Sequence, residues 1–151
     1  MRIIEDDLSS ADVAELLREH LAEMAKNSPA ESIHALELPA LRAPDITFWT
    51  AWDDSTLLGC GALKELDAQH GEIKSVQTAI KHRGRGVASA ILSHLIEESV
   101  RRTYLQLSLE TGSGPAFDPA HCLFEKFGFR YCGPFGDYAD DPFSRFMTLT
   151  L

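Results

Sequence analysis

Apolar residues recur every three or four positions in two stretches of the chain, which predicts two amphipathic helices. The first stretch spans residues 13–24 and follows Ser9 or Ser10, either of which can cap a helix N-terminus. The second spans residues 87–100 and ends before a pair of arginines, whose charges suit the negative end of the helix dipole. A third, shorter helix is predicted over residues 120–127, directly before a glycine.

Runs rich in apolar and β-branched residues predict strands around these helices. The motif Asp53-Asp54-Ser55 separates two runs as a hairpin turn does, so three consecutive antiparallel strands are expected in the middle of the chain. Residues 27–44 contain three prolines and are expected to be irregular, with one short helix. The predicted strands are residues 2–4, 46–52, 57–66, 72–78, 105–110, 129–132 and 146–151.

The order of these elements predicts a fold of the α+β class, in which a mixed, mostly antiparallel sheet is flanked by helices. The strand that follows the second helix is expected to run parallel to the strand that precedes it. With 151 residues, 44% of them hydrophobic, the chain is long enough for one hydrophobic core and too short for a second. A single domain is therefore expected over residues 1–151.

The net charge of the chain is strongly negative and narrows the choice of partners. The sequence has 14 Lys+Arg against 23 Asp+Glu, which gives −9. A field of this sign disfavours nucleic acid and anionic membranes, so an anionic ligand needs a local basic pocket. The sequence has no apolar run of about 18 residues and begins with an acidic segment instead of a signal peptide. A cytoplasmic protein is expected.

The cysteines and histidines predict neither a disulfide framework nor a metal site. Cys60, Cys122 and Cys132 are odd in number and lack C-x-x-C spacing, and the six histidines form no metal-binding pattern. Reduced thiols and no metal ion are therefore expected. Cys122 is expected to be packed in the interior and not to carry an acyl group.

The segment Lys81-His82-Arg83-Gly84-Arg85-Gly86-Val87-Ala88 lies between a predicted strand and the second helix. Its glycines let the backbone approach a ligand, and the first N–H groups of a helix have no partner within the helix. Three cations at a helix N-terminus oppose the dipole unless an anion binds there. The segment therefore predicts a pyrophosphate site. Neither the P-loop pattern of ATP sites nor the complete dinucleotide pattern G-x-G-x-x-G is present.

The hexapeptide Arg83-Gly84-Arg85-Gly86-Val87-Ala88 resembles the R-x-x-G-x-G/A signature of the GCN5-related N-acetyltransferases, the GNAT superfamily. Two further segments extend the resemblance in the right order and spacing. Residues 72–78 are similar to the fourth strand of the family, and residues 120–129 resemble its A-x-x-L-Y-x-x-x-G-F segment. Together these segments cover residues 71–129. The chain most resembles a small, single-domain member of bacterial type.

The resemblance implies binding of acetyl-CoA as co-substrate, without a metal ion. It places the pyrophosphate on the backbone amides of residues 83–88. The pantetheine runs along residues 76–78, between two parallel strands that splay apart in the middle of the sheet. Side chains of the arginines and of Lys126 reach the cofactor, and Phe124 lies beside its sulfur. The implied cofactor-binding residues are Val76, Gln77, Thr78, Arg83, Gly84, Arg85, Gly86, Val87, Ala88, Phe124 and Lys126.

Two residues depart from the pattern of the family. Phe117 stands where an asparagine often precedes the A-x-x-L-Y segment, and Phe124 stands where a tyrosine is often credited with protonating the CoA thiolate. A phenylalanine cannot donate a proton. Water, Tyr131 or Tyr138 is therefore left as the donor, and a thiolate can also leave without one.

A carboxylate is expected to take the proton from an ammonium acceptor before the nitrogen attacks. Glu72 occupies the strand position from which some members of the family supply a glutamate base. Glu110 ends the neighbouring parallel strand. The catalytic candidates are therefore Glu72 and Glu110, acting directly or through water, and the sequence does not choose between them.

Direct transfer of an acetyl group to the amine of a small molecule is the first functional hypothesis. The alternatives are acetylation of a protein N-terminus or lysine, and a non-catalytic CoA-binding sensor, which the loss of the tyrosine at position 124 favours. Acceptor specificity is expected to come from residues 24–45 and 133–144, which match no motif. A homodimer through a sheet edge or the final strands is left open.

Overall fold

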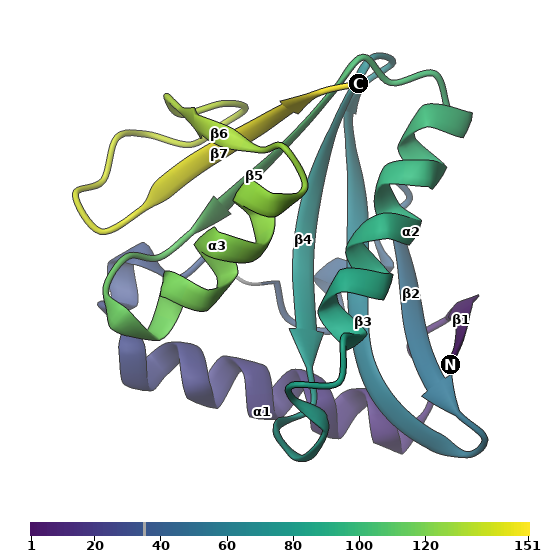
Figure 1. Ribbon diagram of the computed structural model, residues 1–151. Helices are drawn as coiled ribbons and strands as arrows, with labels where there is room; N and C mark the ends of the chain where they lie inside the picture. Colours follow the sequence, from purple (N-terminus) through teal and green to yellow (C-terminus); the bar gives the residue numbers. More distant parts are fainter. Residues whose placement is uncertain (35) are drawn as a thin grey trace.

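The computed structural model describes residues 1–34 and 36–151 and shows one mixed sheet with helices on both faces (Figure 1). Within these residues, seven strands follow in the spatial order β1-β2-β3-β4-β5-β7-β6, and only β4 and β5 run parallel. The strands are β1 Arg2–Glu5, β2 Ile46–Asp53, β3 Thr56–Asp67, β4 His70–Thr78, β5 Gln106–Thr111, β6 Arg130–Cys132 and β7 Arg145–Thr150. The α+β class and the mostly antiparallel sheet expected from the sequence are confirmed.

The described residues form three α-helices: α1 Ala11–Asn27, α2 Val87–Arg101 and α3 Asp118–Lys126. The hydroxyl of Ser10 accepts a hydrogen bond from the Val13 N–H and caps α1. In the described part of the chain, each helix is too short or too polar to span a membrane. Four 3₁₀ turns complete the elements: η1 Ala30–Ser32, η2 Ala40–Arg42, η3 Ile80–His82 and η4 Pro115–Phe117. Two of them, η1 and η2, replace the one short helix expected between α1 and β2.

Helices α2 and α3 cover one face of the sheet, and α1 covers the other. The alternation of side chains along β3 produces this arrangement. Leu63 packs in one hydrophobic cluster with Ile91 of α2, whereas its neighbour Ala62 packs in a second cluster with Val13 of α1. A Cβ atom on Gly61 would lie 2.6 Å from the Cγ2 atom of Ile91. Helix α2 therefore packs directly on the backbone of β3.

The parallel strands β4 and β5 pair only over their first residues. Their register ends at Glu72 opposite Ser108, and beyond this point the strands diverge, as Figure 1 shows. Just beyond this point two residues of β4, Ser75 and Val76, lie opposite the single residue Gly61 of β3, and Ser75 has a φ of 56°. Such a bulge bends a strand, so β4 turns away from β5. The splayed pair expected in the middle of the sheet is confirmed.

Two expectations about single residues were wrong. Leu105 was placed at the start of a strand, but β5 begins at Gln106 and the side chain of Leu105 is 56% exposed. The reason is that Tyr104, its neighbour, takes the core position at this end of the sheet. Cys122 was expected in the interior but is exposed. Helix α3 turns His121 and Phe124 inward, which leaves Cys122 on its outer face.

Candidate active site

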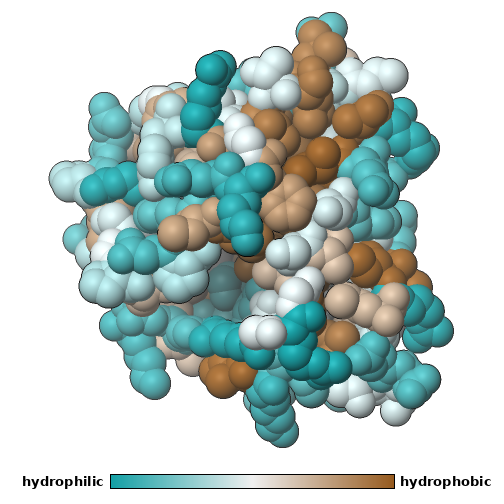
Figure 2. Space-filling view, viewed as in Figure 1, coloured by the Kyte–Doolittle hydropathy of each residue, from teal (hydrophilic) through white to brown (hydrophobic). Residues whose placement is uncertain are grey.

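A cleft of about 440 Å³ opens where β4 and β5 separate. Its walls come from α1, β4, β5, the start of α2, the segment 112–117, α3 and two loop residues, His34 and Tyr138. Figure 2 shows a recess on this face, between the region of α3 and the region of α1. Of the thirteen site residues expected from the sequence, the cleft is lined by Glu72, Val76, Gln77, Thr78, Arg83, Ala88, Glu110 and Phe124.

One end of the cleft lies at the loop that leads into α2. Gly84 and Gly86 have φ values of 78° and 79°, and a Cβ atom at either position would meet nothing within 4 Å. Gly86 is the N-cap residue and offers no side-chain acceptor to the first N–H groups of the helix. Open space, positive φ and free N–H groups are the features that a bound phosphate requires. The residues present therefore fit the pyrophosphate of a CoA molecule.

The remaining expected residues of this region lie around the cleft without lining it. The side chain of Val87 is 2% exposed and packs in the core, so only its backbone can face a ligand. Lys126 lies in the last turn of α3 with an exposed side chain. The structure gives no contact between Lys126 and the cleft, so its expected part in cofactor binding stays a prediction.

Both arginines of the loop are paired with carboxylates. Arg83 forms an ion pair of 2.5 Å with Glu23 of α1, and Arg85 forms one of 2.9 Å with Asp53 at the end of β2. The Nη1 atom of Arg85 also lies 2.9 Å from the Nδ1 atom of His82. The two guanidinium groups are about half exposed, and exposed ion pairs contribute at most about 1 kcal/mol. A phosphate group can therefore displace these carboxylates.

The segment Val76–Thr78 forms the wall of the cleft along β4. One edge of this segment pairs with β3, and the other edge has no neighbouring strand because β5 has diverged. The side chain of Gln77 turns away and donates a hydrogen bond to the carbonyl oxygen of Leu16, 3.4 Å away. The segment therefore offers backbone groups to an extended ligand, as expected for a pantetheine chain.

Five residues form what we call the acceptor end of the cleft: His34, Glu72, Lys74, Glu110 and Tyr138. The Tyr138 hydroxyl donates to the Oε2 atom of Glu72 at 2.6 Å, and the Lys74 ammonium donates to the same atom at 3.2 Å and to the Tyr138 hydroxyl at 3.0 Å. The ring of His34 meets the ring of Tyr138 edge-on at 5.1 Å. Burial raises the pKa of Tyr138, and the negative charge of Glu72 raises it further.

Glu110 is held less firmly than Glu72. Its Oε2 atom is buried, and among the described residues no group hydrogen-bonds to it. Burial raises the pKa of Glu110 and the charge of Glu72 raises it further, whereas the nearby Ser144 hydroxyl, His34 and Lys74 act to lower it. The structure therefore separates two carboxylates that the sequence left equal, because Glu72 is held in a hydrogen-bonded cluster and Glu110 has a free oxygen atom.

Phe124 lines the cleft and also belongs to the core. Its side chain is 7% exposed, and its ring packs against that of Phe129 at 5.7 Å. Phe117 lines the cleft beside it and packs edge-on against Phe143. The side chain of His121 lies 2.6 Å from the hydroxyl of Thr111 and links α3 to the end of β5. No proton donor stands at the position of Phe124 or Phe117.

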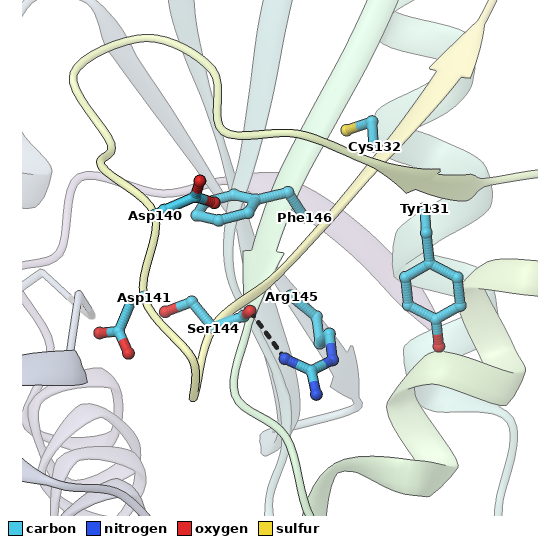
Figure 3. A pocket seen from close by; sticks show the side chains of 7 residues that line it. All are labelled: Tyr131, Cys132, Asp140, Asp141, Ser144, Arg145 and Phe146. Carbon is cyan, nitrogen blue, oxygen red and sulfur yellow. Dashed lines mark hydrogen bonds between the residues drawn. The ribbon is translucent and has the colours of Figure 1, made fainter.

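Tyr131 and Tyr138, the two tyrosines considered as proton donors, lie in different places. Tyr138 lines the cleft, whereas Tyr131 is 52% exposed and lines a second pocket of about 360 Å³ (Figure 3). Figure 3 also shows Arg145 in this pocket, with its guanidinium donating to the backbone carbonyl of Ser144. Tyr131 is therefore separated from the residues of the acceptor end.

His34 has no signal in the sequence, and Tyr138 has only a weak one. Both residues come from the segments 24–45 and 133–144, which were expected to shape acceptor specificity; Ala35, within the first segment, lies outside the described residues. No motif marks these segments. Their residues reach the cleft through contacts with parts of the chain that are distant in sequence, and a short sequence window does not contain such contacts. Lys74 is readable from the sequence, since it lies two positions from Glu72 on the same face of a strand.

A family model described as the acetyltransferase (GNAT) family matches residues 11–129. The chain belongs to this family, as the sequence motifs indicated. Helix α1, β4, the loop before α2 and most of α3 all fall within the matched range. The chain is therefore an acetyltransferase by family.

Curated relatives agree with this assignment. The chain is 56% identical to the uncharacterized N-acetyltransferase YsnE of Bacillus subtilis (strain 168) over 151 residues, which cover both chains completely. It is 48% identical to the uncharacterized N-acetyltransferase YedL of Escherichia coli (strain K12), over 97% of this chain and 92% of that protein. It is 38% identical to an IAA acetyltransferase of Azospirillum brasilense, over 82% of this chain and 80% of that protein.

Solved structures share the fold at lower sequence identity. A Klebsiella pneumoniae protein described as an acyl-CoA N-acyltransferase superposes with a TM-score of 0.80 at 24% identity, over 99% of this chain and 97% of that chain. A GNAT family acetyltransferase of Elizabethkingia anophelis, solved with acetyl-CoA bound, superposes with a TM-score of 0.69 at 16% identity, over 99% and 97%. The fold described above is therefore one that holds acetyl-CoA in another protein.

Proposed function

We propose that this protein transfers the acetyl group of acetyl-CoA directly to the amine of a small molecule, in a complex that contains both substrates. The observation that carries this proposal is the single cleft between β4 and β5. It joins a loop shaped for phosphate groups to a buried carboxylate with a free oxygen atom. The donor and the acceptor can therefore meet without a covalent enzyme intermediate, and the exposed Cys122 lies outside the cleft lining.

The donor is proposed to lie along the loop and β4. The backbone amides of residues 83–88 hold the pyrophosphate, and the side chains of Arg83 and Arg85 exchange their carboxylate partners for phosphate oxygens. The free edge of Val76–Thr78 binds the pantetheine through backbone groups. Phe124 supports the thioester from the side of α3.

Glu110 is proposed as the base. An acceptor amine reaches the cleft as its ammonium ion, and a carboxylate with a raised pKa is a stronger proton acceptor than an exposed one. Glu110 takes this proton, the neutral nitrogen attacks the thioester carbonyl, and backbone N–H groups on the free edge of β4 stabilise the oxyanion. The C–S bond then breaks and the nitrogen releases its extra proton to water, which leaves the neutral amide and the CoA thiolate.

Glu72 is proposed as a second, weaker candidate, because its Oε2 atom already accepts two hydrogen bonds. The same cluster argues against Tyr138 as the proton donor for the thiolate. Its hydroxyl donates to Glu72, and its pKa is raised, so loss of its proton is unfavourable. Water is proposed as the donor instead, which suits a leaving group that is stable as a thiolate.

A small acceptor is proposed in preference to a protein because the acceptor end is enclosed. Glu72 and Lys74 have side chains that are 4% and 9% exposed, and His34 and Tyr138 cover them from two separate loops. We further place the enzyme in the cytoplasm, where its three free cysteines stay reduced. Dimerisation through an edge strand, β1 or β6, remains a hypothesis that sedimentation at several protein concentrations tests.

The proposal is tested by measuring CoA release from acetyl-CoA with a panel of small amines and with a lysine-containing peptide. We expect turnover with amines and none with the peptide. Acetyl-CoA binding without turnover on any acceptor would favour the sensor hypothesis, and turnover with the peptide alone would favour a protein acetyltransferase.

The placement of the pyrophosphate is tested with the Gly86→Asp variant. The added carboxylate stands where a phosphate is expected, so CoA affinity should fall by more than about 2 kcal/mol in calorimetry. The matched control is Gly86→Asn, which has a similar shape, tolerates the positive φ and carries no charge. Unchanged CoA affinity in a folded Gly86→Asp protein would refute this placement.

A further inference from the structure

The charges at the acceptor end do not balance. In the described part of the chain, Glu72 and Lys74 form a buried ion pair of 3.2 Å, and Tyr138 holds both partners by hydrogen bonds. Glu110 adds a second carboxylate, and the buried Oε2 atom of this residue has no hydrogen-bond partner there. With His34 counted as neutral, two negative charges therefore meet one positive charge, which leaves one negative charge to be neutralised.

Lys74 and Glu110 lie on the two strands that border the opening of the sheet, close enough for the charge of Lys74 to act on Glu110. Glu72 is opposite Ser108 in the last pair of the β4–β5 register, and Lys74 and Glu110 each follow two residues later. Side chains two residues apart on a strand share a face, so all four lie on the same face of the sheet. A cation that binds to Glu110 therefore comes close to the ammonium group of Lys74.

From this arrangement we infer that Lys74 determines the charge of the acceptor: the site takes a primary amine whose amino group is its only charge, attached to an uncharged body. This inference rests on the proposed transfer to a small amine and specifies which amines are used. The ammonium group neutralises Glu110. The uncharged body lies among the rings of His34, Tyr138 and Phe117, which line the same cleft.

A second charge on the acceptor is disfavoured whichever sign it has. A second ammonium group within the cleft is repelled by Lys74, whose own carboxylate partner is already in place. A carboxylate on the acceptor is repelled by Glu72 and Glu110. These interactions act at short range in a partly buried site, where Coulomb energies are several times larger than in water. Lys74 is therefore a specificity residue that acts against wrong acceptors.

Three amines of equal chain length test the inference: butylamine, 1,4-diaminobutane and 4-aminobutanoate. They differ only in the distal group, which is apolar, cationic or anionic. We expect the kcat/KM of the wild-type enzyme for butylamine to exceed the values for the other two by at least about tenfold. Equal or better use of 1,4-diaminobutane or 4-aminobutanoate by the wild-type enzyme would overturn the inference.

Variants at position 74 show whether Lys74 is responsible. Lys74→Gln removes the charge and keeps a hydrogen-bond donor for Glu72, so the preference for butylamine over the diamine should shrink at least about tenfold. Lys74→Arg keeps the charge and should keep the preference. The matched control is Lys64→Gln, which removes a charge from β3 opposite Glu72 without lining the cleft. A preference that Lys74→Gln leaves unchanged would overturn the inference.

A binding measurement separates this inference from the proposed function. Each amine is titrated by calorimetry into the enzyme saturated with CoA, which requires no turnover. If CoA binds and no amine is acetylated, the proposed transfer fails, but tighter binding of butylamine that depends on Lys74 still supports the inference. If all three amines bind equally, or none binds, the inference is wrong.

Discussion

The proposed role of Glu110 as the base has a consequence for folding. A carboxyl group whose pKa is raised on folding holds its proton more tightly in the folded state. Its contribution to stability is therefore complete below the pKa of the unfolded chain and is lost as the pH rises through the folded pKa. At neutral pH the charged form destabilises the fold, and it is also the form that the proposed base needs for removal of a proton.

We therefore predict that Glu110→Gln lowers kcat by at least about 100-fold and raises Tm at pH 7, because a base is lost and a buried charge is removed. The kcat/KM of the wild-type enzyme should fall as the pH is lowered and Glu110 becomes protonated. The pKa read from this fall should lie above the usual carboxyl value of 4.5. Steady-state kinetics and thermal unfolding measure both effects.

Glu72→Gln is the comparison for this variant. It leaves Lys74 and Tyr138 without their charged acceptor, so it should lower Tm. If Glu72→Gln abolishes turnover while Glu110→Gln keeps it, the assignment of the base is wrong. CoA affinity should be unchanged in both variants, since neither residue lies near the loop at residues 83–88.

The substitution Phe124→Tyr restores the hydroxyl that many family members carry. We predict a change in turnover of less than about threefold, because the thiolate leaves readily and proton removal from the amine is the harder step. The ring lies in both the core and the cleft, so the new oxygen atom has room only on the cleft side. A gain above about tenfold would show that thiolate departure limits the wild-type enzyme. Loss of CoA binding would show that the position is only structural.

At the scale of secondary-structure elements, an ion pair connects α1 to the loop at residues 83–88. Glu23 on α1 holds Arg83, and both residues line the cleft. We predict that Glu23→Gln tightens CoA binding by up to about fivefold, because Arg83 no longer has to exchange partners and an exposed pair contributes at most about 1 kcal/mol. Calorimetry with CoA measures the change.

The control for this prediction is Glu19→Gln, one turn earlier on α1. The Glu19 carboxylate accepts a hydrogen bond from the Ile80 N–H and does not pair with Arg83, so CoA affinity should stay the same. Arg83→Gln should weaken binding. Weaker CoA binding in Glu23→Gln would show that Glu23 supports the loop instead of competing with the phosphates.

Most elements could be predicted from the sequence because each has a local cause. The hydrophobic period of α2, the Ser10 cap of α1 and the Asp-rich turn before β3 are all readable in short windows. The exposure of Leu105 and Cys122 was missed, since it depends on which neighbour takes the core position. The difference between Glu72 and Glu110 was missed because Tyr138, from a loop 66 residues away in sequence, decides it.

At the scale of the whole molecule, charge is distributed unevenly around the cleft. The protein carries a net charge of −9, yet the loop that is expected to hold phosphates contains Lys81, Arg83 and Arg85. The acceptor end has one unbalanced carboxylate among the described residues. The sequence reveals the net charge, the basic loop and the carboxylates Glu72 and Glu110, and the fold brings these two carboxylates into one cleft. An anionic donor and a cationic acceptor are therefore attracted to opposite ends of the same cleft.

This distribution predicts how salt affects the reaction. A cationic amine is attracted by the field of the whole protein, so its kcat/KM should fall about threefold to tenfold as salt rises from about 0.02 M to about 0.2 M. Over this range the Debye length shortens from about 20 Å to about 7 Å, so distant carboxylates stop contributing. Electrostatic steering changes only the rate at which the amine meets the enzyme. The kcat at saturating amine should therefore change little with salt. Initial rates with butylamine at fixed, saturating acetyl-CoA measure both quantities. A kcat/KM that stays constant or rises with salt would mean that only the contacts inside the cleft select the acceptor.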